Sequence, residues 1–432
     1  MHHEVVTYSS SAVDYAEHFG EYGELVRGLY KRILPVNTIE NANVIEFKVD
    51  GGDDFLDLRE SFMRIEVQLL KADDTNLDEG ANTAFVDNIL HSIFEKVVIF
   101  LNGKKITDGN ALQAYKNYFV ARFGVSKSAR NIHLKALQGL TGEAAGKHNT
   151  RNADATGWTQ RKAWTAKSTT LALQGPIPSD FFMSCEKYLP PTVEMRLEFK
   201  LCDSDFATNT TSPLTVKFRV NKFDLMMRSV EIAATRKQEI FNQLRQTPWT
   251  FNYTSMDIQT HSIAAGMKRI NIRNIFASQL PKQVYVMFAE TGSVSGDPNA
   301  DPFDFKHANI EKMVLRKNNV PLMVEEVASD FSTPQGAKEV YNWFLQALDV
   351  GFNSRDVGVT LEQFCAGCTV WAWTLCPDMD ANSGLRIPFQ PGDLQLDIHV
   401  NQVRNNPALT VIILGKFGSM VKIDEQGGVY TF

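Results

Sequence analysis

Two cysteines three positions apart, Cys365 and Cys368, have the spacing of a zinc or redox motif, and Cys376 and His399 follow them. A structural zinc site normally has a second closely spaced ligand pair, which this sequence lacks. A thioredoxin-like motif opens a helix after a strand, whereas residues 369–373 (TVWAW) have the β-branched and aromatic composition of a strand. We therefore expect structural cysteines, in preference to metal ligands or a redox centre.

The histidines offer no stronger site. Apart from His2 and His3, none of the nine lies close to another, so the His-x-His pair of a cupin-type metal centre is absent. Residues 142–147 (GEAAGK) superficially resemble a phosphate-binding loop. That segment is one residue short, and His148 stands where the loop requires Ser or Thr.

Three aspartates form an acidic loop, Asp297, Asp301 and Asp304, interrupted by Pro298 and Pro302. The prolines and the spacing favour an ordinary loop over a calcium site. The sequence also has no Gly-x-Ser-x-Gly nucleophile elbow. We expect no catalytic, cofactor-binding or metal-binding residues and no cofactor. The protein is predicted to act through its surfaces and not as an enzyme.

The composition is that of an ordinary globular protein of two domains. The chain has 432 residues, of which 44% are hydrophobic and 22% charged, and its net charge is −6. The mild charge gives no reason to expect sequence-specific nucleic-acid binding. Residues 1–24 lack the basic flank and apolar segment of a signal peptide, and the five cysteines are odd in number. We expect a protein that is made and folded in a reducing compartment, the cytoplasm, without a signal peptide.

A buried strand is predicted at residues 97–101 (VVIFL), which Asn102 and Gly103 terminate. The pattern around it recurs 186 positions later (88 to 274), which suggests a duplicated β-domain. The matches are Asn88, Ile89, Ser92, Lys96 and Val98 with Asn274, Ile275, Ser278, Lys282 and Val284. A second echo, Lys222-Phe223 with Lys416-Phe417, keeps the same order.

The rest of the chain follows an all-β pattern with few helices. Period-two alternation predicts strands at 44–49, 63–69, 192–201, 214–220, 223–232, 249–258, 268–272, 283–289, 311–316, 368–375, 393–400, 410–414 and 416–423. Helical spacing predicts helices at 110–124, 233–246 and 334–350.

Two segments are expected to differ from the β-domains. Residues 1–43 are predicted to be an N-terminal arm, acidic from Asp14 to Glu24, with helical spacing at Leu25, Leu29 and Ile33. Residues 124–176 are predicted to be a long loop. Its 124–168 part has eight Lys and Arg against two acids, and Trp158 and Trp164 do not form a regular stacking array, so we expect an exposed loop or subunit contact.

Several motifs in this order resemble the double-jelly-roll major capsid proteins of the Polinton/Maverick–adintovirus lineage, which are similar to PRD1 and adenovirus capsid proteins. The matching segments are IEFKVDGGDDFLDL (45–58), MRIEVQLLKAD (63–73), FVDNILHSIFEKVVIFLNGKKITD (85–108), GPIPSDFF (175–182), 280–289, NADPFDFKH (299–307) and VIILGKFGSMVKID (411–424). The helix at 111–123 lacks the Tyr-rich motif of that family, which suggests a divergent branch.

The resemblance implies two tandem eight-stranded antiparallel jelly rolls, at 44–235 and 249–424, with short helices in their loops, a linker at 236–248 and a tail at 425–432. It further implies homotrimeric, pseudo-hexameric capsomers that tile an icosahedral virion and contact neighbouring capsomers and penton or minor capsid proteins. It leaves open whether a membrane lies beneath the shell. The alternatives are a jelly-roll module that binds carbohydrate or cell surfaces, and a minor vertex protein.

Overall fold

The computed structural model describes residues 25–40, 42–50, 52–107, 111–211, 214–276, 279–322, 326–351, 355–376, 392–401 and 407–431. The predictions for residues 1–24, including the acidic part of the arm, lie outside the described residues, as does Ser278 of the repeated pattern. None of the described helices is long and apolar enough to cross a membrane.

The first half of the chain is mainly β-structure. Its described strands are β1 (Leu25–Ile33), β2 (Val44–Val49), β3 (Phe55–Lys71), β4 (Thr83–Phe85), β5 (Phe94–Leu101), β6 (Lys104–Lys105), β7 (Leu171–Pro176), β8 (Met195–Leu201), β9 (Thr208–Thr210) and β10 (Val216–Ile232). Its helices are α2 (Ile89–Ser92), α3 (Gln113–Phe123), α4 (Lys127–Ala129), α5 (Lys135–Gln138), α6 (Thr156–Trp164), α7 (Asp180–Ser184) and α8 (Ser204–Ala207), with a π-helical segment at Arg130–Leu134 and a 3-10 turn at Ala166–Ser168.

Helix α9 (Ala234–Gln246) connects the halves, as the sequence predicts. The described strands of the second half are β11 (Trp249–Ile263), β12 (Arg269–Ile275), β13 (Gln283–Glu290), β14 (Ile310–Lys317), β15 (Val320–Pro321), β16 (Val327–Ala328), β17 (Trp371–Thr374), β18 (Leu394–Val400), β19 (Leu409–Ile423) and β20 (Val429–Thr431). Its helices are α10 (Thr291–Val294), α11 (Lys338–Ala347), preceded by a 3-10 turn at Pro334–Ala337, and α12 (Leu361–Cys365).

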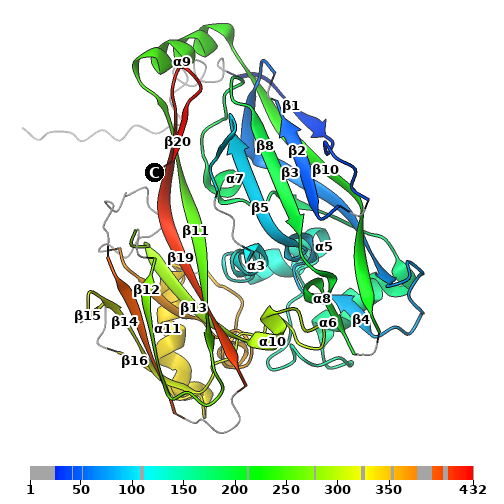
Figure 1. Cartoon of the computed structure of the whole chain (residues 1–432), viewed down its shortest axis with the longest axis vertical. Coiled ribbons are helices and arrows are strands. Elements are labelled where there is room, and N and C mark those ends of the chain that lie inside the picture. Colours follow the sequence, from blue (N-terminus) through cyan, green and yellow to red (C-terminus); the bar gives the residue numbers. More distant parts are fainter. Residues whose placement is uncertain are drawn as a thin grey trace, which may run out of the picture.

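Both halves have the same sheet topology. The first half has one sheet in the order β1-β10-β3-β7 and a second in the order β2-β8-β5-β6, and the second half has β11-β19-β13-β17 and β12-β18-β14-β15. We number the eight strands of these two described sheets from 1 to 8 along each half. In both halves the strand order is then 1-8-3-6 in one sheet and 2-7-4-5 in the other, and all pairings are antiparallel. Two four-stranded sheets facing each other in this order, eight strands in all, form a jelly roll. Figure 1 shows the two bodies, with α9 joining them at one end. The predicted double jelly roll is confirmed.

The strands follow the period-two pattern of the sequence. In β3, Met63, Ile65 and Val67 are fully buried, whereas the charged and polar residues between them remain partly exposed. Strand β13 differs, because Val284 to Ala289 are all buried. It lies between β17 and β19 in its sheet, and the ring of Phe119 from the first half packs 4.5 Å from that of Tyr285.

Each core includes side chains from the other half. Helix α3, which lies between the jelly rolls in Figure 1, places Tyr118, Phe119 and Phe123 in the core of the second half. In return, Phe251 of β11 and Val421 of β19 are buried in the core of the first half. The predicted helix at 110–124 is thus present but is buried on more than one face. The two jelly rolls therefore form one interlocked body.

The helical prediction for Leu25, Leu29 and Ile33 is wrong. This segment is strand β1, which pairs with β10 and forms an edge of the first sheet. Positions four apart share a face in a strand as well as in a helix, so the spacing fits both periods. Pairing with β10, nearly 200 residues later, decides between them.

The prediction of an exposed loop at 124–176 is also wrong, because residues 171–176 form strand β7 and much of 124–168 is helical, while the alternative of a subunit contact stays a prediction. Within this segment, Trp158 and Arg161 are buried. Arg161 donates to the main-chain oxygen of Phe85 at 2.8 Å and forms an ion pair with Glu143 at 3.0 Å. The basic residues do not all face solvent, because buried carboxylates and carbonyls pair with some of them.

The sequence repeat at 88 and 274 lies in both jelly rolls, but it matches strands that are not equivalent in the two sheet topologies. Asn88 leads into β5, the fourth strand of its jelly roll, whereas Asn274 leads into β13, the third. Both asparagines have a left-handed backbone, with φ of 55° and 58°. The pattern therefore reflects a shared left-handed asparagine ahead of a buried strand, although Asn88 precedes helix α2 and Asn274 lies near the end of β12. Lys222 and Lys416 do lie on equivalent strands, β10 and β19.

Candidate functional site: the joints between the jelly rolls

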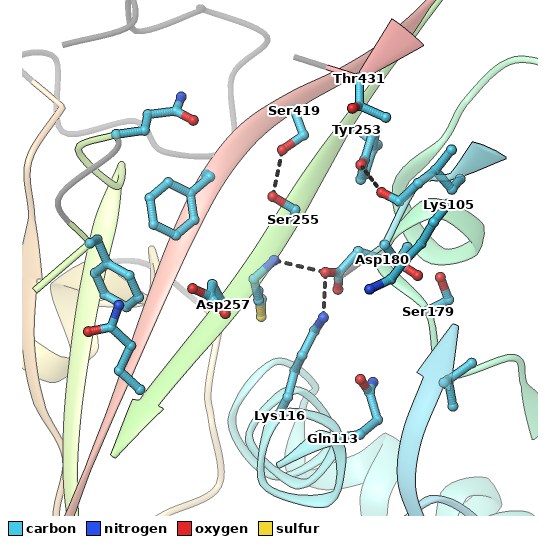
Figure 2. Close-up of a pocket in the computed structure, with 18 of the residues that line it drawn as sticks. Lys105, Gln113, Lys116, Ser179, Asp180, Tyr253, Ser255, Asp257, Ser419 and Thr431 are labelled. Atoms are coloured by element: carbon cyan, nitrogen blue, oxygen red, sulfur yellow. Dashed lines mark hydrogen bonds and ion pairs between the residues drawn. The ribbon is translucent and has the colours of Figure 1, made fainter. Parts of the chain in front are cut away.

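An open cavity of about 640 Å³ lies between the two jelly rolls. Its walls come from α3, from α7 and the residues before it, and from β11 and β19. Figure 2 shows Lys116 and Asp180 from the first half facing Ser255 and Ser419 from the second. Because polar and charged side chains of both halves line this cavity, it is a candidate for a binding or catalytic site.

Polar groups from α7 and the residues after it cap the outer edge of β11. The main-chain N–H of Met256 donates to Asp180 Oδ2 at 2.8 Å, and that of Thr254 donates to Ser184 Oγ at 3.0 Å. Ser184 Oγ in turn donates to the main-chain oxygen of Thr254 at 3.2 Å. An edge strand presents unpaired main-chain groups that need partners. Here side chains of the other jelly roll supply those partners.

Two lysines complete this contact. Lys187 Nζ donates to the main-chain oxygen of Thr250 at 2.9 Å. Lys116 forms an ion pair with Asp180, and both side chains are only 13% exposed. Lys187 thus bonds directly to the second half, whereas the Lys116–Asp180 pair lies within the first half and holds the carboxylate that accepts from Met256. This geometry is that of a joint between domains, and the lining residues include no histidine or cysteine.

A second joint is the buried polar junction, which we define as Arg122, His148, Asp304 and Cys368. Arg122 lies at the end of α3, and His148 lies in the segment between α5 and α6. Asp304 lies in the loop before β14, and Cys368 lies between α12 and β17. The first two belong to one jelly roll and the last two to the other, and all but Asp304 are at least nine-tenths buried.

The distances in the buried polar junction are those of a charged cluster. Arg122 Nη2 lies 3.9 Å from Cys368 Sγ, and His148 Nδ1 lies 3.8 Å from Asp304 Oδ1. Neighbouring main-chain and side-chain bonds hold the loops in place. Asn149 Nδ2 donates to Asp304 Oδ2 at 2.8 Å, and the N–H of Gly146 donates to the oxygen of Ala366 at 2.7 Å.

The neighbouring charges raise the pKa of His148 and lower the pKa of the Cys368 thiol. Burial opposes charge on His148, but the neighbouring charges of Cys368, Asp301 and Asp304 outweigh it and raise the pKa of His148 to about 9. Burial likewise opposes a charged Cys368, but Arg122 and His148 lower the pKa of its thiol. Because burial makes unpaired charges costly, each group stabilises the charge on the other.

A thiolate next to a histidine and a carboxylate has the components of a nucleophilic site. Cys368 is only 2% exposed, however, so its sulfur lies out of reach of a substrate from solvent. Within the described residues, no group of three or more His, Cys, Asp or Glu side chains could hold a metal ion. The junction is therefore suited to holding the jelly rolls together.

The residues that the sequence singled out are scattered across the fold. Cys365 and Cys368 are both free thiols, and only Cys368 belongs to the junction. Cys376 is buried near the main-chain oxygen of Lys282. His399 lies on β18, cross-strand from Arg269 and Lys312. Among the described residues, Cys365, Cys368, Cys376 and His399 thus form no common metal-binding group.

The acidic loop contributes Asp304 to the junction. His148, which directly follows the phosphate-loop-like segment 142–147, is another member. Asp297 and Asp301 accept main-chain N–H groups two residues ahead, from Asn299 and Phe303. These bonds are those of ordinary loop turns. Sequence reasoning missed the junction because its four members lie at positions 122, 148, 304 and 368, in three separate weak motifs and one helix.

No protein-family model and no curated protein matches the chain. Among solved structures, a chain of the Sputnik virophage, solved by cryo-EM, superposes with a TM-score of 0.65 at 12% identity, over 99% of this chain and 93% of that one. The mavirus major capsid protein superposes with a TM-score of 0.55 at 9% identity, over 99% and 95% of the two chains.

The chain has the fold of these viral proteins. A chain of the PBCV-1 virus capsid is also similar, with a TM-score of 0.56 at 11% identity, over 93% of this chain and 96% of that one. The matches span both jelly rolls and the connection between them. The likeness therefore extends to the tandem arrangement and is not confined to a single sandwich.

Proposed function

We propose that this chain is a structural major capsid protein of an icosahedral double-stranded DNA virus. The observation that carries the proposal is the tandem pair of jelly rolls with one strand order, matched end to end by the mavirus major capsid protein. The sequence motifs described above point to the same class. The pairing of polar groups within both joints supports a role in assembly rather than in catalysis, without a cofactor or metal.

The finer form of the proposal is a homotrimer. Three chains with two similar jelly rolls each form a pseudo-hexagonal, hexon-like capsomer that contacts neighbouring capsomers and penton or minor capsid proteins in the virion. The sequence motifs between 45–58 and 411–424 support membership of the Polinton/Maverick–adintovirus lineage.

We retain the domain division as part of the proposal, with one change. The first jelly roll begins at Leu25, because β1 belongs to its sheet, and it ends at 235. The linker is 236–248, the second jelly roll is 249–424, and the tail is 425–432, of which β20 pairs with β19.

The test is the mass and shape of the purified full chain at rising concentration, by light scattering and negative-stain imaging. Particles of about three times 48.5 kDa with a hexagonal outline, or closed shells, are the expected result. A chain that stays monomeric at every concentration contradicts the proposal, and screening against glycans would then test the binding-module alternative.

A further inference from the structure

The turn that holds the cysteine pair is a contact between the two jelly rolls. We call residues 365–368 the CAGC turn. The main-chain oxygen of Ala366 accepts the N–H of Gly146 at 2.7 Å. Gly367 has a φ of 115°, and a Cβ atom at this position would overlap the ring of His148. Because Gly146 and His148 belong to the first half, a change in the shape of the CAGC turn changes the contact with the other jelly roll.

The backbone brings the two cysteines of the CAGC turn close together. Thr369 Oγ1 donates to the main-chain oxygen of Phe364 at 2.6 Å, so the two residues that flank the turn are tied to each other. A disulfide needs Cα atoms that are roughly 4.4–6.8 Å apart. A turn of this length, closed at its ends, places Cys365 and Cys368 within reach of each other, and both are free thiols.

The two thiols differ in their access to solvent. Cys365 is partly exposed, and it lines an open cavity of about 300 Å³ together with Lys306 and His307. Cys368 is buried and faces Arg122. A reagent from solvent therefore meets Cys365 first, and Cys368 reacts only with a group that is already bound to Cys365.

Cys368 is suited to the second step of such a reaction. Burial opposes a negative charge on its sulfur, but Arg122 and His148 outweigh burial and lower the pKa of this thiol. The thiolate is the nucleophile in thiol–disulfide exchange, so a lower pKa increases the reactive fraction.

We propose that Cys365 and Cys368 form a reversible disulfide by exchange with a small-molecule disulfide, and that this disulfide loosens the contact between the jelly rolls. In the first step, the Cys365 thiolate attacks one sulfur of the reagent, forms a mixed disulfide and releases one thiolate. In the second step, the Cys368 thiolate attacks the Cys365 sulfur and expels the other thiolate. The cysteine pair is oxidised, and the reagent is reduced to two thiols that take up the two protons lost by the cysteines.

The disulfide removes Cys368 from the buried polar junction. Its sulfur turns toward Cys365 and no longer carries a negative charge. Arg122 and His148 then lose the sulfur as a partner, and Arg122 Nε already has no hydrogen-bond partner among the described residues. A buried charge without a partner is costly, so the junction opens more often. Both thiols belong to one chain, so this inference does not depend on assembly.

The test treats the purified full chain with oxidised glutathione and analyses its peptides by mass spectrometry. The number of free thiols is expected to fall by two from the five cysteines of the sequence, through a disulfide between Cys365 and Cys368 that dithiothreitol reverses. C365S is expected to leave Cys368 free, because no bound group reaches it. C368S is expected to keep one glutathione on Cys365, because the second step is removed.

Hydrogen exchange of the same samples measures the contact between the jelly rolls. The N–H of Gly146, which donates to Ala366, is expected to exchange roughly tenfold faster after oxidation of the wild type, and at an unchanged rate in treated C365S. Strand β8, in the interior of its sheet, is the internal control.

Three results overturn the inference. They are a wild type in which the disulfide between Cys365 and Cys368 does not form, a disulfide that leaves the exchange of Gly146 unchanged, and an equal acceleration in C365S. Each of them leaves the proposed function standing, because that function is tested by the mass and shape of the particles.

Discussion

Asp180 Oδ2 accepts the main-chain N–H of Met256 at 2.8 Å, so a carboxylate of one jelly roll closes the sheet edge of the other. The same carboxylate is paired with Lys116, whose side chain is mostly buried. One residue thus links α3, α7 and β11, and the relative position of the two jelly rolls depends on it.

Replacement of Asp180 by alanine removes both interactions. Hydrogen bonds to charged groups contribute about 1.5–3 kcal/mol, and the buried Lys116 is left without its partner, so we expect a loss of roughly 3 kcal/mol in the free energy of unfolding. Denaturant unfolding followed by fluorescence measures it. Asp154→Ala is the control, because Asp154 is 64% exposed and 3.7 Å from Lys147. Equal effects of the two substitutions would show that the cap contributes nothing.

His91 is expected to make the protein sensitive to acid. Burial lowers the pKa of this histidine to about 4, and its Nε2 lies 3.0 Å from the main-chain oxygen of Pro176. The unfolded chain binds a proton near pH 6.5 that the folded chain does not accept until about pH 4. The contribution of His91 to stability is therefore complete above pH 6.5 and declines as the pH falls toward 4, by roughly 3 kcal/mol.

His91→Gln is expected to flatten this dependence. Thermal unfolding midpoints measured between pH 4 and 7 test the prediction, with His133→Gln, at an exposed position, as the control. A slope that survives the loss of His91 would assign the acid sensitivity to other groups.

The alkylation rates of Cys365 and Cys368 show whether the thiolate fraction or the solvent exposure of a thiol controls its reactivity. Cys368 has a lowered pKa and thus more thiolate, but it is 2% exposed, whereas Cys365 is partly exposed and burial raises its pKa. Alkylation requires both a thiolate and an approach path. We expect Cys365 to react at least roughly tenfold faster than Cys368 under native conditions, as measured by mass spectrometry over time.

In urea, both cysteines are expected to react completely, which confirms that the reagent is not limiting. If Cys368 were modified first in the folded protein, the buried polar junction would open in solution. Its thiol would then be available for chemistry, in conflict with a purely structural role.

Substitution of Phe119 tests how much the packing of first-half side chains in the core of the second half contributes to stability. The ring of Phe119 lies 4.5 Å from that of Tyr285 and 5.3 Å from that of Phe123, and it is buried in the second core although α3 belongs to the first half. Phe119→Ala is expected to lower the free energy of unfolding by about 3–5 kcal/mol, because a large cavity forms. Calorimetry measures the change. Ile132→Ala, at a position 67% exposed, is expected to cost less than about 0.5 kcal/mol.

Local patterns predicted most of the elements. The alternation in β3, the apolar run of β5 and the helical spacing of α3, α9 and α11 were all readable, because each depends on which residues share one face. Leu25 to Ile33 were misread because residues four apart satisfy both periods. The basic segment at 124–168 was misread because the sequence does not show that Glu143 and Phe85 satisfy Arg161.

The sequence by itself determined that the chain has two β-domains, where most of their strands lie, and that α9 joins them. Only the tertiary structure decided that Asn88 and Asn274 precede non-equivalent strands, that α3 fills the core of the other half, and that Arg122, His148, Asp304 and Cys368 meet. The physical reason is the distance along the sequence between the residues that interact. A periodic pattern records the faces of one element, whereas strand order and buried ion pairs depend on partners that lie up to about 250 residues apart.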